Sequence, residues 1–193
     1  MILLMLLVFA ALPAAAQSNH EFGIVVGAST RNLQSTGTED GAGAFLDDEL
    51  NLSHNVIELS YGLKLDDQTW IKVKAGRIET PIRFTTREVA NNDGTVTRFA
   101  KDEEGEVQHV SLVAEYRFSE PLGSSSIFAG IGAYRHSSDS AKSEADFGYQ
   151  FGVNADFPIT RNYGFVVEGA YHWTRAPYNP KYLTVGGGVR FSF

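Results

Sequence analysis

The sequence contains no cysteine and only two methionines, and acidic residues outnumber basic ones. Without cysteine the chain can form neither a disulfide scaffold nor a zinc–thiolate site. Its 23 Asp and Glu against 16 Lys and Arg give a net charge of −7, which argues against a nucleic-acid partner held through phosphate contacts. Helical periodicity is also missing after residue 17. What remains is an acidic chain of 193 residues, rich in glycine and aromatics, whose length suits one domain.

The first residues have the pattern of an export signal. Residues 2–16 are almost wholly apolar and end in three alanines, after which the sequence turns polar at Gln17. Small residues at this point suit a signal peptidase, and the apolar run is shorter than the roughly 20 residues that a membrane-spanning helix needs. We therefore expect residues 1–16 to be a signal peptide cleaved near Ala16-Gln17, and residues 17–193 to form the mature domain. A buried core helix is the alternative.

The rest of the chain alternates between apolar and polar residues with a period of two, which is typical of strands. Segments of about ten residues are long enough to cross a membrane when they are tilted. In one segment, residues 127–136, the two faces cannot be told apart because Gly, Ala and Ile occupy both. Eight strands are expected, near residues 22–28, 56–65, 71–76, 110–118, 127–136, 147–157, 165–173 and 183–193.

The connections between these segments alternate in length, as in an up-and-down barrel with tight turns at one end and longer loops at the other. Within one long connection, Asn91-Asn92-Asp93-Gly94 predicts a hairpin turn, so the flanking strands should continue beyond the membrane as a protruding ribbon. The long connections are residues 31–53 and 78–106, and the short ones are residues 66–69, 119–126 and 158–163.

The same pattern fits two classes of barrel, one in a membrane and one a soluble lipocalin-like binder that is apolar inside. Small residues such as Gly62, Gly76 and Gly152 fill the polar faces and suit a narrow interior better than a solvated surface. Aromatics collect near both ends of the apolar faces, as at membrane interfaces. The sequence therefore favours an all-β fold, an eight-stranded antiparallel transmembrane β-barrel in the outer membrane.

Charged residues on the polar faces are nearly balanced, as a closed interior would require. We expect an interior ion-pair cluster in the half nearer the periplasm, which plugs the barrel and pins the strand register. A gated ion path through the same charges is the alternative. The predicted cluster consists of Glu58, Lys72, Lys74, Glu115, Arg117, Glu168 and Arg190.

The ending of the chain adds a resemblance to a known family. Gly188, Phe191 and Phe193 are similar to the C-terminal signal that the outer-membrane assembly machinery reads. With the expected signal peptide and strands, the chain resembles the OmpA/OmpX-type small outer-membrane barrels. The resemblance implies an outer-membrane location in a Gram-negative cell envelope, contact with outer-membrane lipid and lipopolysaccharide, and a structural or surface-interaction role. An external protein partner would meet loops 31–53 and 78–106.

The sequence gives only weak support for a catalytic site. His172 and Thr174 are similar to the His-x-Ser element of the lipid A deacylases, but threonine replaces serine and no acidic residue follows Glu168. His136, Ser138 and Asp139 form a second set that chance could produce in a polar loop. We therefore expect no enzymatic activity, with lipid A modification as the alternative.

No cofactor and no metal are expected either. His20, His54 and His109 are scattered along the sequence, and the glycines lie in strands rather than before a helix. Asp47, Asp48 and Glu49 are typical of a solvated loop, with a calcium site as the alternative.

Overall fold

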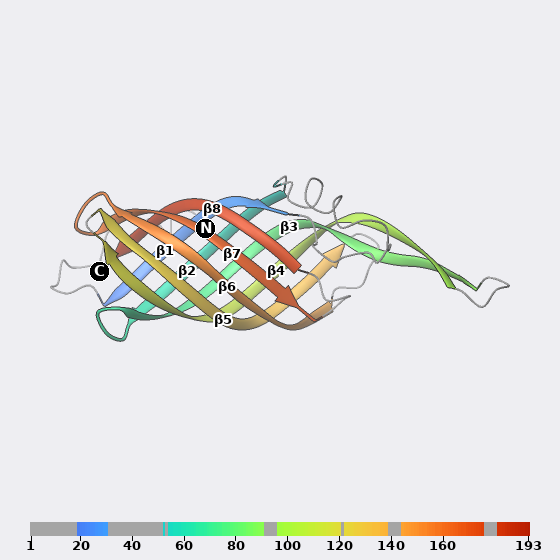
Figure 1. The fold of residues 1–193 in the computed structure, drawn as a ribbon, viewed down its shortest axis with the longest axis horizontal. Helices are drawn as coiled ribbons and strands as arrows, with labels where there is room; N and C mark the ends of the chain where they lie inside the picture. Colours follow the sequence, from blue (N-terminus) through green and yellow to red (C-terminus); the bar gives the residue numbers. More distant parts are fainter. Residues whose placement is uncertain are drawn as a thin grey trace, which may run out of the picture.

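The computed structural model is a closed barrel in which every strand is antiparallel to its neighbours (Figure 1). It describes residues 19–30, 52, 54–90, 96–120, 122–138, 144–175 and 181–193. No helix among these residues is both long and apolar enough to span a membrane. The strands are β1 (His20–Ser29), β2 (His54–Lys64), β3 (Thr69–Ala90), β4 (Val96–Glu120), β5 (Gly123–Ser138), β6 (Glu144–Pro158), β7 (Tyr163–Thr174) and β8 (Lys181–Ser192).

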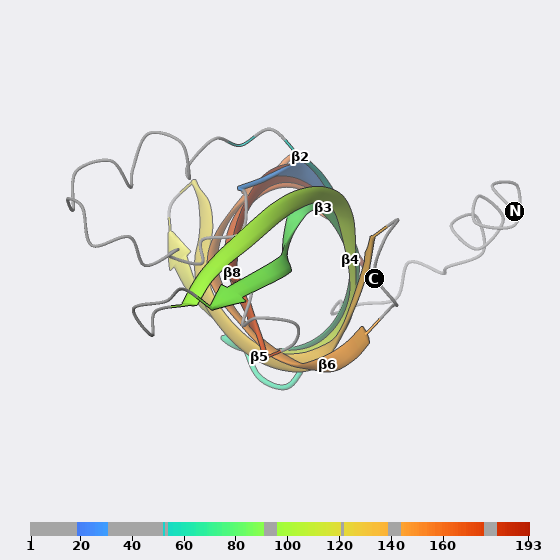
Figure 2. The same ribbon diagram turned by 90° about the vertical axis from the view of Figure 1, so that its right-hand side faces the viewer.

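The barrel closes where β1 pairs with β8. The two ends of the described barrel meet there, because the amide of His20 donates to the carbonyl of Phe193 at 3.1 Å and the amide of Phe193 donates back at 2.9 Å. Each strand pairs with the next in the sequence, so the view along the axis shows a complete ring (Figure 2). The eight-stranded up-and-down fold predicted from the period-two pattern is confirmed.

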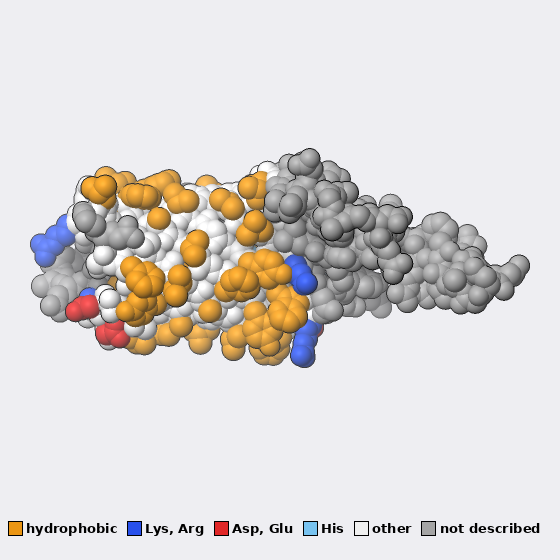
Figure 3. Space-filling model, viewed as in Figure 1, with side chains coloured by type: hydrophobic (Ala, Val, Ile, Leu, Met, Phe, Trp, Pro, Cys, Tyr) orange, Lys and Arg blue, Asp and Glu red, His pale blue; other side chains and the backbone are white. Residues whose placement is uncertain are grey.

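Apolar side chains are spread over the outside of this ring (Figure 3). Polar side chains lie inside it, where they are buried. Val110 and Leu112 on β4 are more than half exposed, whereas Ser111 between them is buried. Since a soluble lipocalin-like barrel has the opposite arrangement, that alternative is wrong. The aromatic side chains that end the outer faces remain exposed at both rims, among them Tyr61, Phe118, Phe157 and Phe165 at one end and Phe147, Tyr149 and Trp173 at the other.

Short turns close the end of the barrel at which β1 begins and β8 ends. In the β2–β3 turn, one carboxylate oxygen of Asp66 accepts from the backbone amides of Gln68 at 2.9 Å and Thr69 at 2.8 Å. These hydrogen bonds hold the pKa of Asp66 below its ordinary value. Outer-membrane barrels have short turns in the periplasm and longer loops outside the cell, so this end is the periplasmic one in the class of barrel that the sequence predicts.

At the opposite end, β3 and β4 continue well past the other strands and form a two-stranded ribbon (Figure 1). The β2–β3 pairing stops at Ile78, and the β4–β5 pairing begins at Gly105. Between these points β3 and β4 pair only with each other in the described part of the chain, up to Ala90 opposite Val96, with one register shift near Thr85. The predicted ribbon is therefore confirmed, and it begins on the extracellular side.

One glycine on the closing seam is needed for close backbone approach. A Cβ atom added at Gly188 would lie 1.9 Å from the carbonyl oxygen of Ile24 on β1. By contrast, a Cβ at Gly169 on β7 would meet only the carbonyl oxygen of Thr184, at 3.9 Å. Gly188 thus allows β8 to lie against β1, whereas Gly169 has room for a side chain.

Candidate functional site in the barrel interior

Six charged side chains from five strands form a periplasmic ion group inside the barrel. It has three cations and three anions, so the group is electrically balanced. Lys72 contacts Glu21 at 2.9 Å and Glu115 at 2.5 Å, and Arg117 contacts the same two carboxylates at 2.7 and 2.5 Å. Arg190 completes the group by pairing with Glu21 at 3.0 Å and with Asp156. The members are Glu21, Lys72, Glu115, Arg117, Asp156 and Arg190.

An aromatic ring covers one side of this group. The guanidinium of Arg117 lies 4.2 Å from the ring centroid of Trp70, which is itself buried in the interior. A guanidinium over an indole face gains electrostatic attraction from the ring. The periplasmic ion group is therefore paired, and the ring covers it on the side of Arg117.

A second set, the central ion group, lies further from the periplasm. The ammonium of Lys74 bridges Glu58 at 2.8 Å and Glu168 at 2.5 Å, across three strands of the barrel. His109 approaches Glu58 at 3.4 Å. Lys74 also stacks on Phe128, with its nitrogen 4.2 Å from the ring centroid. Because two carboxylates share one ammonium, Lys74 is the residue on which the electrostatics of this group depend.

Beyond the central ion group, toward the ribbon, the interior is filled by a histidine–tyrosine layer, defined as His109, Tyr134, His136, His172 and Tyr182. The rings of His109 and Tyr134 stack with centroids 5.3 Å apart. The hydroxyl of Tyr134 lies 3.1 Å from Nδ1 of His172. Each of these side chains is almost fully buried. Neutral rings and hydroxyls thus replace ion pairs in this half.

The structure places all seven residues of the predicted cluster inside the barrel, but in two groups rather than one. Lys72, Glu115, Arg117 and Arg190 belong to the periplasmic ion group. The others belong to the central ion group, and they are Glu58, Lys74 and Glu168.

Sequence reasoning missed Glu21, which contacts three cations. Glu21 directly precedes Phe22, which belongs to the apolar face of β1. Alternation along this strand would therefore have placed Glu21 on the inner face. The histidine–tyrosine layer was missed as well. Tyr134 and His136 lie in the segment whose two faces could not be told apart, and His109 was dismissed as isolated.

The residues of the enzyme hypothesis also face the interior. His172 and Thr174 are each about 1% exposed, whereas Trp173 between them points outward. His172 contacts Tyr134 and Thr184, and the hydroxyl of Thr174 lies 3.3 Å from Nε2 of His136. Asp139 and the acidic run at residues 47–49 lie outside the described residues.

Comparison with known proteins assigns the chain to a family. The model of the outer membrane protein beta-barrel domain matches residues 1–193. The chain belongs to that family. Its members are outer-membrane barrels, so the protein lies in the outer membrane, as the sequence predicted. A comparison with curated proteins finds no match.

Two solved structures show the same family fold. Neisserial surface protein A (NspA) is 12% identical, with a TM-score of 0.60 over 90% of this chain and 96% of that one. The N-terminal β-barrel domain of Pseudomonas aeruginosa OprF is 16% identical, with a TM-score of 0.53 over 91% of this chain and 98% of that one. At these identities the likeness extends to the fold alone.

Proposed function

We propose that this outer-membrane barrel is a structural scaffold that presents the β3–β4 ribbon to an external protein. The observation that carries the proposal is the pairing of the ribbon, whose two strands hydrogen-bond only to each other in the described residues beyond Ile78 and Gly105. A two-stranded ribbon has an outer edge on each strand, and an extended foreign segment can add to such an edge through main-chain hydrogen bonds.

Excision of the ribbon tests this role. Residues 80–105 would be replaced by an Asn-Gly turn, which closes a hairpin between Glu79 and Glu106, two residues already opposite each other. Cells with the wild-type barrel should attach to a surface coated with serum proteins, and cells with the excised barrel should not. A retained heat-dependent shift in gel mobility is the control for folding. Equal attachment by both would contradict the proposal.

We further infer that the interior is a plug and not a pore. Support comes from the central part of the interior, where the cavity beside Glu58, Glu168 and His172 is only about 10 Å³, barely enough for one water molecule. A wider cavity of about 340 Å³ lies at the periplasmic end beside Glu21 and Asp156, so the plug is formed by the layers beyond it. An eight-stranded barrel is just wide enough for its own side chains to fill it. Ion pairs between β1, β3, β4 and β8 would then hold the strand register.

We infer no catalytic role for this chain. A lipid A deacylase must bring a nucleophile to an acyl chain in the surrounding lipid, whereas Thr174 and His136 are buried inside the barrel. Mass spectrometry of lipid A from cells with and without the protein tests this. Identical acyl patterns are expected, and a lost acyl chain would restore the enzyme hypothesis.

The ending of the chain supports a proposal about assembly. Phe191 and Phe193 stack with ring centroids 5.5 Å apart at the periplasmic end of β8. We propose that Gly188, Phe191 and Phe193 form the signal that the assembly machinery reads.

A further inference from the structure

Charged residues are divided unevenly along the β3–β4 ribbon. Its tip part, residues 83–101, has more basic residues than acidic ones, whereas its base part, residues 79–82 and 102–106, has acidic residues and no basic one. Arg83 pairs with Asp102 in the strand register, so the boundary lies at the same level on both strands. The ribbon is therefore positive toward its tip and negative toward the barrel. The basic residues of the tip part are Arg83, Arg87, Arg98 and Lys101, its acidic residues are Glu88 and Asp93, and the acidic residues of the base part are Glu79, Asp102, Glu103, Glu104 and Glu106.

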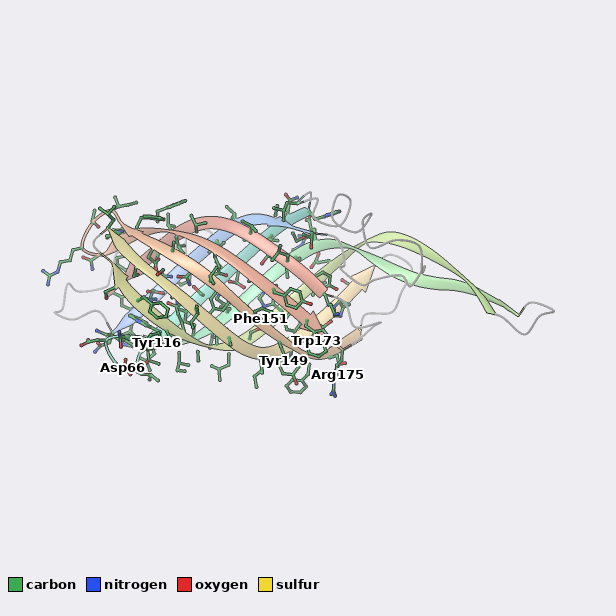
Figure 4. All side chains as sticks on the ribbon, viewed as in Figure 1. Asp66, Tyr116, Tyr149, Phe151, Trp173 and Arg175 are labelled. Atoms are coloured by element: carbon green, nitrogen blue, oxygen red, sulfur yellow. The ribbon has the colours of Figure 1, made fainter. Side chains whose placement is uncertain are left out.

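The ribbon extends past the extracellular rim of the barrel. Tyr149 on β6 and Trp173 on β7, whose ring centroids are 5.7 Å apart, mark the end of the apolar surface, and β3 and β4 continue beyond them (Figure 4). From Glu79 to Ala90, at roughly 3.3 Å per residue, β3 gives the ribbon a length of about 40 Å. A ribbon of this length can be reached by a protein on a neighbouring cell.

The ribbon has two edges, and the edge on β4 is the better one for strand addition. β3 contains Pro81, which has no amide to donate, and the β3–β4 register shifts near Thr85. Residues 96–104 of β4 contain no proline, and in the described part of the chain β5 begins to pair with β4 only at Gly105. The β4 edge is thus a continuous row of main-chain groups, positive toward the tip and negative toward the base.

This direction of charge determines which arrangement of two copies is favourable. Two copies in one membrane stand parallel, so the acidic base of one lies at the level of the acidic base of the other. Two copies in the facing membranes of neighbouring cells run antiparallel, so the tip of each lies at the level of the base of the other. Opposite charges then meet in both halves of the contact. Antiparallel pairing of two identical edges also has two-fold symmetry, which makes it a closed interface.

We propose that the ribbon binds a second copy of itself on a facing cell, through antiparallel pairing of the two β4 edges. This inference rests on the function proposed for the ribbon and names the partner. In the complex, Arg98 and Lys101 of each copy are brought to the level of residues 102–104 of the other. Main-chain hydrogen bonds join the two ribbons into one four-stranded sheet, and the charges set its direction.

Exchange of the charges tests this partner. Cells that do not clump by themselves display the full mature chain, each strain carries one of two colours, and two-coloured clumps are counted after mixing. R98E/K101E leaves only acidic charges on residues 96–104 of β4, and E103K/E104K leaves mostly basic ones. Each variant alone should form about tenfold fewer clumps than wild type, because like charges then meet along the contact. The two variants mixed together should clump like wild type, because their edges are complementary to each other.

Two further variants serve as controls. K64E/R161E makes the same change of charge at the periplasmic end and should clump like wild type. Arg98 pairs with Glu88 in the register, whereas Lys101 pairs with Phe84, so K101E alone changes the edge without placing two carboxylates opposite each other. It should also reduce clumping, and E103K/E104K should restore it in a mixture. A retained heat-dependent gel shift shows that each barrel has folded.

Two results would overturn the inference. If the mixture of the two charge variants did not clump, the edges would not be complementary. If R98E/K101E stopped clumping and E103K/E104K did not, the tip would bind a polyanion on the neighbouring cell instead. Wild-type cells that attach to the coated surface but never clump would contradict this inference alone and leave the proposed function in place. Cells with the excised ribbon that still attach and still clump would contradict both.

Discussion

The two halves of the barrel interior are filled in different ways. Near the periplasm, Glu21, Glu115 and Asp156 are matched by three cations. Toward the ribbon, the side chains that point into the barrel carry rings and hydroxyls instead, and Tyr134, His172 and Tyr182 are among them. A narrow barrel can thus be filled by paired charges or by stacked neutral rings. The difference has an energetic consequence, because a charge that loses its partner in the interior costs far more than a lost hydroxyl contact.

The largest effect should come from Lys74→Ala. This change leaves Glu58 and Glu168 buried without their shared cation, and it should destabilise the barrel by about 3–5 kcal/mol. Unfolding by urea in detergent micelles, followed on gels by heat-dependent mobility, measures it. Lys64→Ala is the matched control, because Lys64 also contacts a carboxylate at 2.8 Å but does so at the surface, with Asp67. Its loss should cost less than about 0.5 kcal/mol. Equal costs would remove the distinction between buried and exposed pairs.

The second largest effect should come from a glycine in the strands of the barrel wall, which surround both halves of the interior. Gly188→Ala should cost about 1–3 kcal/mol, because the new Cβ meets the backbone of Ile24 and one strand must shift. Gly169→Ala, on the neighbouring strand, should cost little because only the carbonyl oxygen of Thr184 is within 4 Å. The same urea unfolding measures both. If Gly188→Ala were as stable as wild type, the β1–β8 seam would be looser than its geometry indicates.

A smaller effect is expected in the neutral half. Tyr134→Phe removes the hydroxyl that lies 3.1 Å from Nδ1 of His172 and keeps the ring that stacks on His109. The cost should be about 1 kcal/mol, the usual value of a single neutral hydrogen bond. A cost as large as that of Lys74→Ala in the same experiment would mean that the two halves are not different in kind.

The smallest effect lies outside the interior. The pKa of Asp66 is lowered by hydrogen bonds from the amides of Gln68 and Thr69, so its carboxylate stabilises the β2–β3 turn above the ordinary Asp pKa. This contribution should be lost as the pH falls through the lowered pKa. Asp66→Asn keeps an acceptor oxygen but cannot titrate, so the difference between the two proteins should shrink on acidification. A constant difference would contradict this account of the turn.

The sequence was sufficient for the fold because every level of pattern agreed. Period-two alternation, turn residues and the terminal aromatics all favour the same antiparallel barrel, and the hairpin turn at residues 91–94 predicted the ribbon. Parity also told which charges face inward. Alternation does not tell which inward side chains contact each other across the barrel, because this depends on how far neighbouring strands are staggered along the axis. Lys74 and Glu168 meet from strands far apart in the sequence, and no spacing predicts this.

The neutral half was harder to predict for a local reason. Gly130, Gly132 and Ala133 hide the parity of β5, so Tyr134 and His136 could not be assigned to a face. Glu21 was overlooked because it lies at the start of a strand, where alternation is short.

Single-channel recording in planar bilayers tests the central claim, that interior side chains, with Lys74 among them, plug the barrel. The purified mature protein is compared with its Lys74→Ala variant. We expect no steady conductance from the wild-type barrel, because Lys74 bridges Glu58 and Glu168 across the interior. Steady conductance from wild type that Lys74→Ala abolishes would contradict the account, since the same charges would then form an ion path.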